Sequence, residues 1–192
     1  MGTRGLYGFR KNNEDKTTYN HFDSYPDYLG VNILKFIRKH SNAALNEFYD
    51  RIIMVDENEK PTSKEIGHCF VNEAVNLDVG TQSIDDWYCL LREMQGNLEA
   101  LFNWEFPYMI DNRNFIKDSL FCEYAYIINL DNNVLEYYEG FQHVPQVGNR
   151  YGMEEDDGYY PCKLVAEIPL ELIKDAENVE EIIAEFMNEA QD

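Results

Sequence analysis

The chain has few basic residues and no long apolar run. Its 192 residues hold 16 Lys and Arg against 36 Asp and Glu, which gives a formal net charge of −20. No stretch approaches the roughly 18 apolar residues that a membrane span needs, and the N-terminus lacks the hydrophobic core of a secretion signal. These absences predict a cytoplasmic protein that neither crosses a membrane nor binds nucleic acid or anionic lipid directly.

Motifs of several enzyme classes are also missing. The sequence contains no glycine-rich phosphate loop, no serine nucleophile elbow and no zinc-binding H-E-x-x-H segment. Its four cysteines, Cys69, Cys89, Cys122 and Cys162, are far apart and show no C-x-x-C spacing. We interpret them as small buried apolar groups, with a zinc site or a catalytic thiol as the alternative. We therefore expect no cofactor and no metal.

The negative charge is concentrated in the later part of the chain. Residues 1–64 are nearly neutral, with a net charge of +1, whereas residues 65–192 carry −21. Such a field attracts a basic protein surface, including the groove of a nucleic-acid-binding protein. The alternative is that the charge serves solubility alone.

Hydrophobic periodicity predicts one domain, 1–192, with an α+β fold. An N-terminal hairpin is expected from strands at 6–10 and 17–23, and three later strands are expected at 121–130, 134–141 and 164–168. Helices are expected between these strands and at the end of the chain, at 33–37, 41–53, 62–75, 83–101 and 177–190. Ser41 or Asn42 is expected to cap the second helix, and Thr62 with Glu65 is expected to form a capping box at the start of the third. The expected fold is an antiparallel sheet, built from the hairpin and the three-strand unit, with the helical middle section and the C-terminal helix packed on it.

The hairpin gathers polar side chains that form a candidate site. If the strands are symmetric about the polar turn at 11–16, Arg4 faces Asp23, and both share a face with Tyr19 and His21. Asp23 would then orient the imidazole, His21 would transfer a proton and Arg4 would hold an anionic oxygen. The alternative is a structural salt bridge beside a packed histidine.

Two tyrosines follow this hairpin and extend the candidate site. Tyr25 and Tyr28 lie on either side of Pro26 in the sequence. We expect them to line the wall of a pocket next to the hairpin.

The same segment carries a resemblance. Met1-Gly-Thr-Arg-Gly-Leu together with Tyr19-Asn-His-Phe-Asp-Ser-Tyr-Pro26 resembles a family of uncharacterised proteins of phages, bacteria and fungi. The hairpin expected at 126–140 is similar to that family as well. The resemblance implies no established activity.

A weaker likeness is to N-terminal-nucleophile hydrolases of the choloylglycine type. Those enzymes begin with a nucleophile, followed by a hairpin that bears an aspartate. The matching position in this chain is Gly2, which has no side chain to attack a carbonyl. The likeness therefore implies at most an inactive relative with the same fold.

Two further groups are candidate binding residues. Tyr137 and Tyr138 alternate along a strand, so we expect at least one of them on the outer side of the sheet, where it would suit a protein interface, unless helices cover both faces. The alternative is that both tyrosines pack in the core. The acidic run of Glu154, Glu155, Asp156 and Asp157 lies in a long loop and lacks the spacing of a calcium site, so we interpret it as a solvated acidic surface.

Two functions follow from these observations. The first is an acidic interaction protein, of phage or mobile-element type, that binds a basic protein surface and inhibits a nucleic-acid-binding or defence protein. The second is a small-molecule-binding domain or hydrolase-like enzyme with its site at the N-terminal hairpin.

Overall fold

A five-stranded sheet forms the larger body of the protein, and the computed structural model describes residues 2–187. The strands are β1 (Gly5–Lys11), β2 (Glu14–Asn20), β5 (Tyr124–Asn129), β6 (Val134–Glu139) and β7 (Lys163–Pro169), in the spatial order β2-β1-β5-β6-β7. The α+β class is confirmed. The sheet is mixed instead of antiparallel, because β1 pairs with β5 in parallel. The long segment between β2 and β5 provides the crossover that a parallel pair requires.

The hairpin turns one residue earlier than the symmetry of its polar turn suggested, so the partner of each β1 residue lies two positions earlier in β2. Asn12 and Asn13 both have positive φ, of 54° and 59°, as a two-residue type I′ turn requires. Lys11 therefore pairs with Glu14, and Leu6 pairs with Tyr19. Because side chains alternate with a period of two, this shift preserves the expected faces but changes which residues lie opposite each other.

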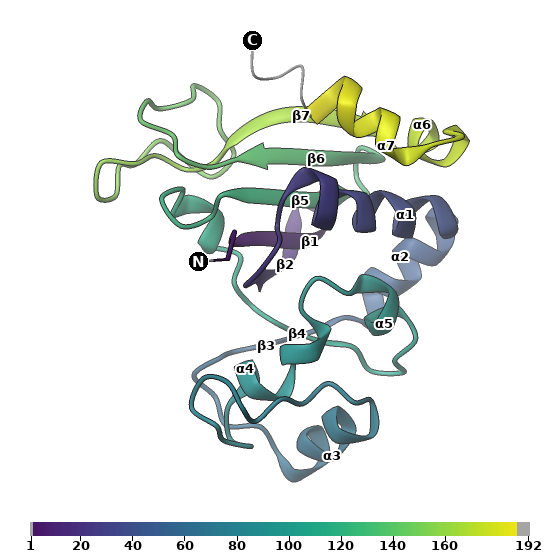
Figure 1. Cartoon of the computed structure of the whole chain (residues 1–192), viewed down its shortest axis with the longest axis vertical. Coiled ribbons are helices and arrows are strands. Elements are labelled where there is room, and N and C mark those ends of the chain that lie inside the picture. The colour runs from purple at the N-terminus through teal and green to yellow at the C-terminus, as the bar shows by residue number, and fades with distance from the viewer. Residues whose placement is uncertain (1, 188–192) are drawn as a thin grey trace.

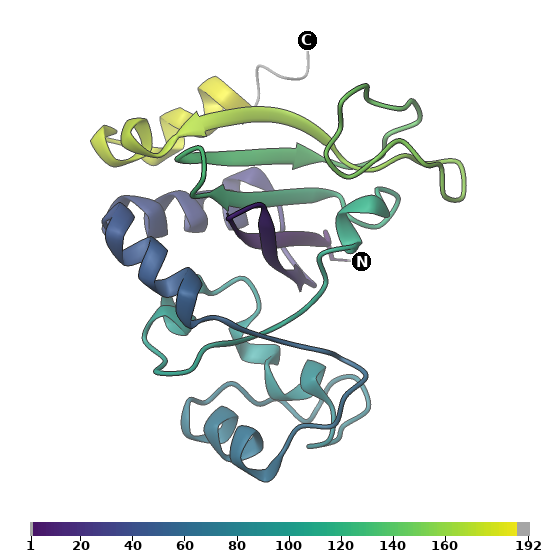
Figure 2. The ribbon, with the colours of Figure 1, turned by 180° about the vertical axis from the view of Figure 1, so that it is seen from behind.

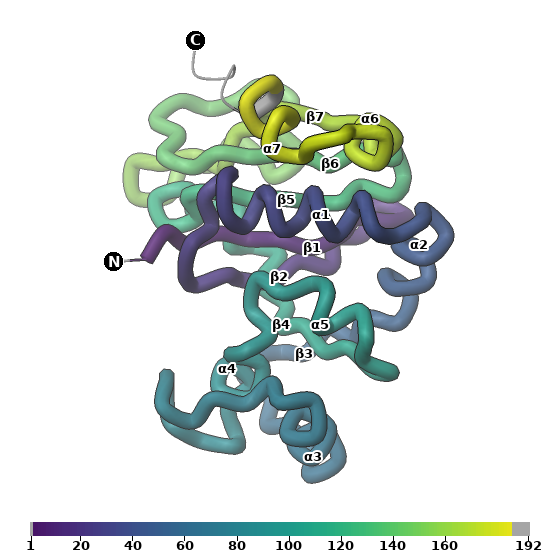
Figure 3. The backbone as a smooth tube through the Cα atoms, turned by 45° about the vertical axis from the view of Figure 1, so that its right-hand side comes forward, coloured from purple at the N-terminus to yellow at the C-terminus, as the bar shows by residue number. Residues whose placement is uncertain are grey.

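Helices cover one face of the sheet (Figures 1 and 3). They are α1 (Val31–Lys39), α2 (Asn42–Arg51), α6 (Leu170–Asp175) and α7 (Val179–Ile182). The Ser41 hydroxyl caps α2 by accepting a hydrogen bond from Ala44 N, as its position in the sequence suggested. Helix α6 was not predicted, because Pro169 was expected only to end a strand, whereas it also begins this helix. After α7 a π-helical turn continues to Met187, and residues 188–190 of the expected terminal helix lie outside the described residues.

Irregular chain covers the opposite face, as Figure 2 shows for the long loops at one end of the sheet. A second hydrophobic cluster forms there from Leu6, Ile116, Cys122, Ala125, Ile127, Tyr138 and Cys162. Tyr137 is 0% and Tyr138 2% exposed. The expectation that one of these tyrosines lies on the surface is wrong, because both faces of β6 are covered.

The middle of the chain forms a smaller part beyond the β2 edge (Figure 1). It contains α3 (Ser63–Val71), α4 (Trp87–Leu90), α5 (Leu98–Phe102) and a parallel pair of short strands, β3 (Ile53–Val55) and β4 (Tyr108–Ile110). The expected capping box of Thr62 and Glu65 opens α3. The helix expected over 83–101 is interrupted, and Gly96 adopts a φ of 73° between its two parts. Within residues 2–187, no helix is long and apolar enough to cross a membrane.

A buried ion pair attaches the long loop after β6 to the sheet. Arg150 donates two hydrogen bonds to the Glu136 carboxylate, at 2.8 and 2.6 Å, and Glu136 is 2% exposed. Asn129 and Tyr138 donate to the same carboxylate. Burial alone would raise the pKa of Glu136, but the hydrogen bonds from Arg150 and Asn129 outweigh it and hold this pKa below its usual range.

Removal of this arginine should destabilise the fold. We expect Arg150→Leu to lower the free energy of unfolding by about 3 kcal/mol, because it leaves a buried carboxylate without its charged partner. Since the native pKa of Glu136 is depressed, the stabilisation is present above the carboxyl's unfolded pKa and is lost as the pH falls through its folded value. Urea denaturation at pH 7 and at decreasing pH measures both effects.

Arg113→Leu is the matched control. Arg113 pairs with Asp111 at a more exposed position, where ion pairs contribute about 1 kcal/mol or less. Equal losses of stability in the two variants would contradict the structural importance of the Glu136–Arg150 pair.

Candidate functional site

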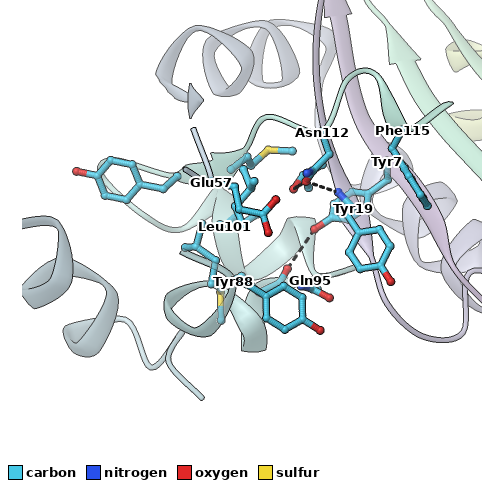
Figure 4. A pocket seen from close by; sticks show the side chains of 14 residues that line it. Tyr7, Tyr19, Glu57, Tyr88, Gln95, Leu101, Asn112 and Phe115 are labelled. Atoms are coloured by element: carbon cyan, nitrogen blue, oxygen red, sulfur yellow. Dashed lines mark hydrogen bonds between the residues drawn. The ribbon is translucent and has the colours of Figure 1, made fainter. Parts of the chain in front are cut away.

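A cavity of about 230 Å³ lies between the N-terminal hairpin and the middle section of the chain (Figure 4). Strands β1 and β2 form one wall, β4 and the residues after it form another, and the segment from α4 to α5 closes the third side. The lining residues are Tyr7, Thr18, Tyr19, Glu57, Tyr88, Leu91, Met94, Gln95, Leu101, Tyr108, Met109, Ile110, Asn112 and Phe115. We call this space the hairpin cavity.

The hydroxyl of Tyr7 fixes the wall opposite the hairpin. It donates to the Met94 carbonyl at 3.2 Å and accepts a hydrogen bond from Gly96 N at 2.9 Å. Burial raises the pKa of Tyr7, so the hydroxyl stays protonated and keeps its donor. At Gly96 the φ of 73° favours glycine, and an added Cβ would lie 2.9 Å from the Asn20 side-chain oxygen.

Hydrogen bonds also hold the hairpin side of the cavity. The side-chain oxygen of Asn112 accepts from Tyr19 N at 3.1 Å and from the Thr18 hydroxyl at 3.3 Å. The Tyr19 hydroxyl lies 2.8 Å from His21 Nδ1, and Gln95 accepts from His21 N. Tyr19 thus joins the cavity wall to the candidate histidine, and burial raises its pKa.

Most of the lining is apolar or aromatic. Rings of Tyr19, Tyr88, Tyr108 and Phe115 border the cavity, and Glu57 is its only charged lining residue within the described part of the chain. Figure 4 shows Glu57, Tyr88, Gln95 and Asn112 around the same space. An apolar wall with a few polar groups is the usual composition of a small-molecule site.

The three groups proposed for acid–base chemistry do not converge. Arg4 lies over the Phe121 ring, with its guanidinium carbon 4.4 Å from the ring centroid. Asp23, with a φ of 53°, is exposed after the end of β2 and has no hydrogen bond to His21 within residues 2–187. Burial lowers the pKa of His21, and the nearby positive charges of Arg92 and Arg4 lower it further. His21 is therefore neutral at pH 7, with Tyr19 as its side-chain partner.

Asp23 and Tyr28 instead line a second, more polar space. This groove, of about 580 Å³, runs between α1 and residues 92–99. Gln95 lines both the groove and the hairpin cavity, so the turn at 94–96 separates the two.

The other residues chosen from the sequence lie apart from the hairpin cavity. Tyr25 is 44% exposed, and its ring centroid lies 6.3 Å from that of Tyr124. The acidic residues Glu154, Glu155, Asp156 and Asp157 are all exposed. Within residues 2–187 no group of three or more His, Cys, Asp or Glu side chains is placed to hold a metal ion.

Sequence reasoning missed most of the cavity. Tyr7, Glu57, Tyr88 and Gln95 come from segments far apart in the sequence and form no motif. Only Tyr19 was both a candidate and a lining residue. The positive φ of Gly96 and the bond from Tyr7 are long-range features that no local pattern predicts.

Searches against protein-family models, curated proteins and solved structures find no match to this chain.

The Tyr7 hydroxyl should be essential for the shape of the site. We expect Tyr7→Phe to lower the free energy of unfolding by about 2 kcal/mol, because it leaves the Met94 carbonyl and the Gly96 amide without their side-chain partner. Amide hydrogen exchange of residues 94–97 should also accelerate. Chemical denaturation and exchange measured by mass spectrometry test the two effects.

Tyr108→Phe is the control. Tyr108 lines the same cavity and has no side-chain hydrogen bond among the described residues. Tyr108→Phe should lower the free energy of unfolding by less than Tyr7→Phe does. An equal decrease in the two variants would rule out a special role for the Tyr7 hydroxyl.

Proposed function

We propose that this protein is a small-molecule-binding domain whose site is the hairpin cavity. The observation that carries this proposal is an aromatic-lined space of about 230 Å³ beside the first hairpin, bordered by Tyr19. It is smaller than the roughly 300–1,000 Å³ of sites for drug-sized ligands, so the ligand is compact. The polar groups at Glu57, Gln95 and Asn112 would orient it.

The arrangement favours binding over catalysis. A general base needs a reacting proton within hydrogen-bond reach and a pKa matched to its task. His21 is hydrogen-bonded to Tyr19, and Asp23 faces the separate groove. At the position where the hydrolase-like alternative needs its N-terminal nucleophile, the chain has Gly2, which carries no side chain to attack a carbonyl.

Compact probes should bind in the cavity and depend on its outer wall. We expect at least one of phenol, indole, acetate and choline to shift the backbone amide signals of residues 88–96 and 108–115 in NMR titrations. Tyr88→Ala should weaken that binding about tenfold or more, because it removes a ring whose burial against a ligand contributes at least about 1.4 kcal/mol.

Phe70→Ala is the matched control for this titration. Phe70 is a half-exposed aromatic residue that does not line the hairpin cavity, so its removal should leave probe binding unchanged. The proposal fails if no probe shifts the cavity amides, or if both variants weaken binding equally.

A second candidate function is binding to a basic protein surface, through which the protein would inhibit a nucleic-acid-binding or defence protein. The exposed run of Glu154, Glu155, Asp156 and Asp157 favours it, together with the net charge of −20. We further propose that the protein acts in the cytoplasm, which is supported by its four buried cysteines without disulfides.

The acidic loop should dominate binding to a cationic partner. We expect neutralisation of Glu154, Glu155, Asp156 and Asp157 to Gln or Asn to weaken binding of a decalysine peptide at low salt. Fluorescence anisotropy at several NaCl concentrations measures this, and wild-type binding should decline steeply as screening increases.

The control neutralises the same number of carboxylates elsewhere, at Glu171, Asp175, Glu180 and Glu181 near the end of the described chain. These four residues should contribute less to binding of the decalysine peptide than the four residues of the acidic loop do. If the two quadruple variants bind equally, the charge acts without a defined surface, and salt-insensitive binding would exclude the electrostatic mechanism altogether.

A further inference from the structure

We infer that the hairpin cavity selects a small organic cation, such as a quaternary ammonium, a methylated amine or a guanidinium group. This inference rests on the proposed function and names the chemical class of its ligand. It is carried by the placement of five aromatic residues and one carboxylate around a single space.

The aromatic rings give the first step. Tyr7, Tyr19, Tyr88, Tyr108 and Phe115 line the cavity, and the Tyr108 ring also packs against His68 and Trp87. The faces of such rings are negative, so they attract a cation that has left water, and neutral apolar groups gain no comparable electrostatic attraction. Within the protein itself, Arg92 and Arg4 already lie over phenylalanine rings, at 5.3 and 4.4 Å.

The lining charge gives the second step. Glu57 is exposed, lines the cavity and has no hydrogen-bond or ion-pair partner among residues 2–187. The lysines that follow it are engaged elsewhere, because Lys60 Nζ lies 2.8 Å from Asp85 and Lys64 Nζ lies 5.9 Å from the Phe106 ring centroid. The Glu57 carboxylate is therefore available to a cation bound against the rings.

Among residues 2–187, no positive side chain lines the cavity to compete with such a ligand. Arg92 is the nearest cation to the shared wall, since it donates to Gln95 at 3.4 Å, but its side chain lines the polar groove. An anionic ligand would meet Glu57 and the negative faces of the rings. The overall charge of −20 also raises the local concentration of cations.

The test compares choline with its uncharged carbon isostere, 3,3-dimethylbutan-1-ol, in NMR titrations of the intact protein. The two probes have nearly the same shape and differ in charge. We expect choline to bind at least about fivefold more tightly, as a cation–π contribution of about 1 kcal/mol requires. Glu57→Gln should lower choline affinity about fivefold and leave the isostere unaffected.

Matched variants separate charge from folding. Glu59→Gln neutralises a neighbouring exposed carboxylate that does not line the cavity, and it should leave the ratio of the two affinities unchanged. Tyr88→Phe keeps a ring and should retain choline binding, whereas Tyr88→Leu should lose the preference for choline.

Each outcome decides a different claim. If choline and the isostere bind equally at the cavity amides, the cavity remains a ligand site but the inference of a cation is overturned. An unchanged affinity ratio in Glu57→Gln overturns it as well. If no small probe binds, the proposed function itself fails.

A final arm identifies the source of the cation. A short peptide that contains one trimethyllysine is titrated beside choline. Tighter binding of the peptide, by about tenfold, would assign the site to a side chain on a basic protein, whereas equal affinities would assign it to a free organic cation. Either result supports recognition of an organic cation in the hairpin cavity.

Discussion

The hydroxyl of Tyr7 is the contact on which the candidate site depends. Strand β1 is held on both sides, by β2 and by β5, so Tyr7 projects from the most constrained part of the sheet. Its hydroxyl accepts from the Gly96 amide and is a second donor to the Met94 carbonyl, which also accepts from Asn97 N. Gln95, in the turn at 94–96, lines both the hairpin cavity and the groove. The Tyr7 side chain therefore holds the turn that forms the boundary between the two spaces.

Several of the few basic residues stabilise the inside of the fold. Arg150 neutralises buried Glu136, Lys16 donates to the carbonyls of Tyr49 and Ile52, and Arg51 donates to the carbonyl of Phe102. The excess of carboxylates is left to determine the external field. A small cation and a basic protein would experience the same attraction, so the two proposed functions share one electrostatic basis and differ in the surface that makes contact.

Local signals in the sequence predicted local structure well. The Ser41 cap, the capping box of Thr62 and Glu65, and the shared face of Tyr19 and His21 were correct, because each depends on residues a few positions apart. The parallel pairing of β1 with β5 and the burial of Tyr138 were not predicted. Both depend on chain segments that are distant in sequence, and the loops that cover Tyr138 have no periodicity. The cavity was missed for the same reason.

The two-residue shift of the hairpin explains why the apparent catalytic group is not one. Side-chain faces survive such a shift, so Tyr19 and His21 remain together, as expected. The residues that lie opposite each other across the two strands change. Asp23 lies beyond the end of β2, where its positive φ directs the chain away from the strand and toward the groove. The imidazole is left with a phenol partner and two nearby guanidinium groups, which favour its neutral form. The hairpin therefore contributes Tyr7, Thr18 and Tyr19 to the cavity wall, whereas Glu57 and the other aromatic lining residues come from later segments of the chain.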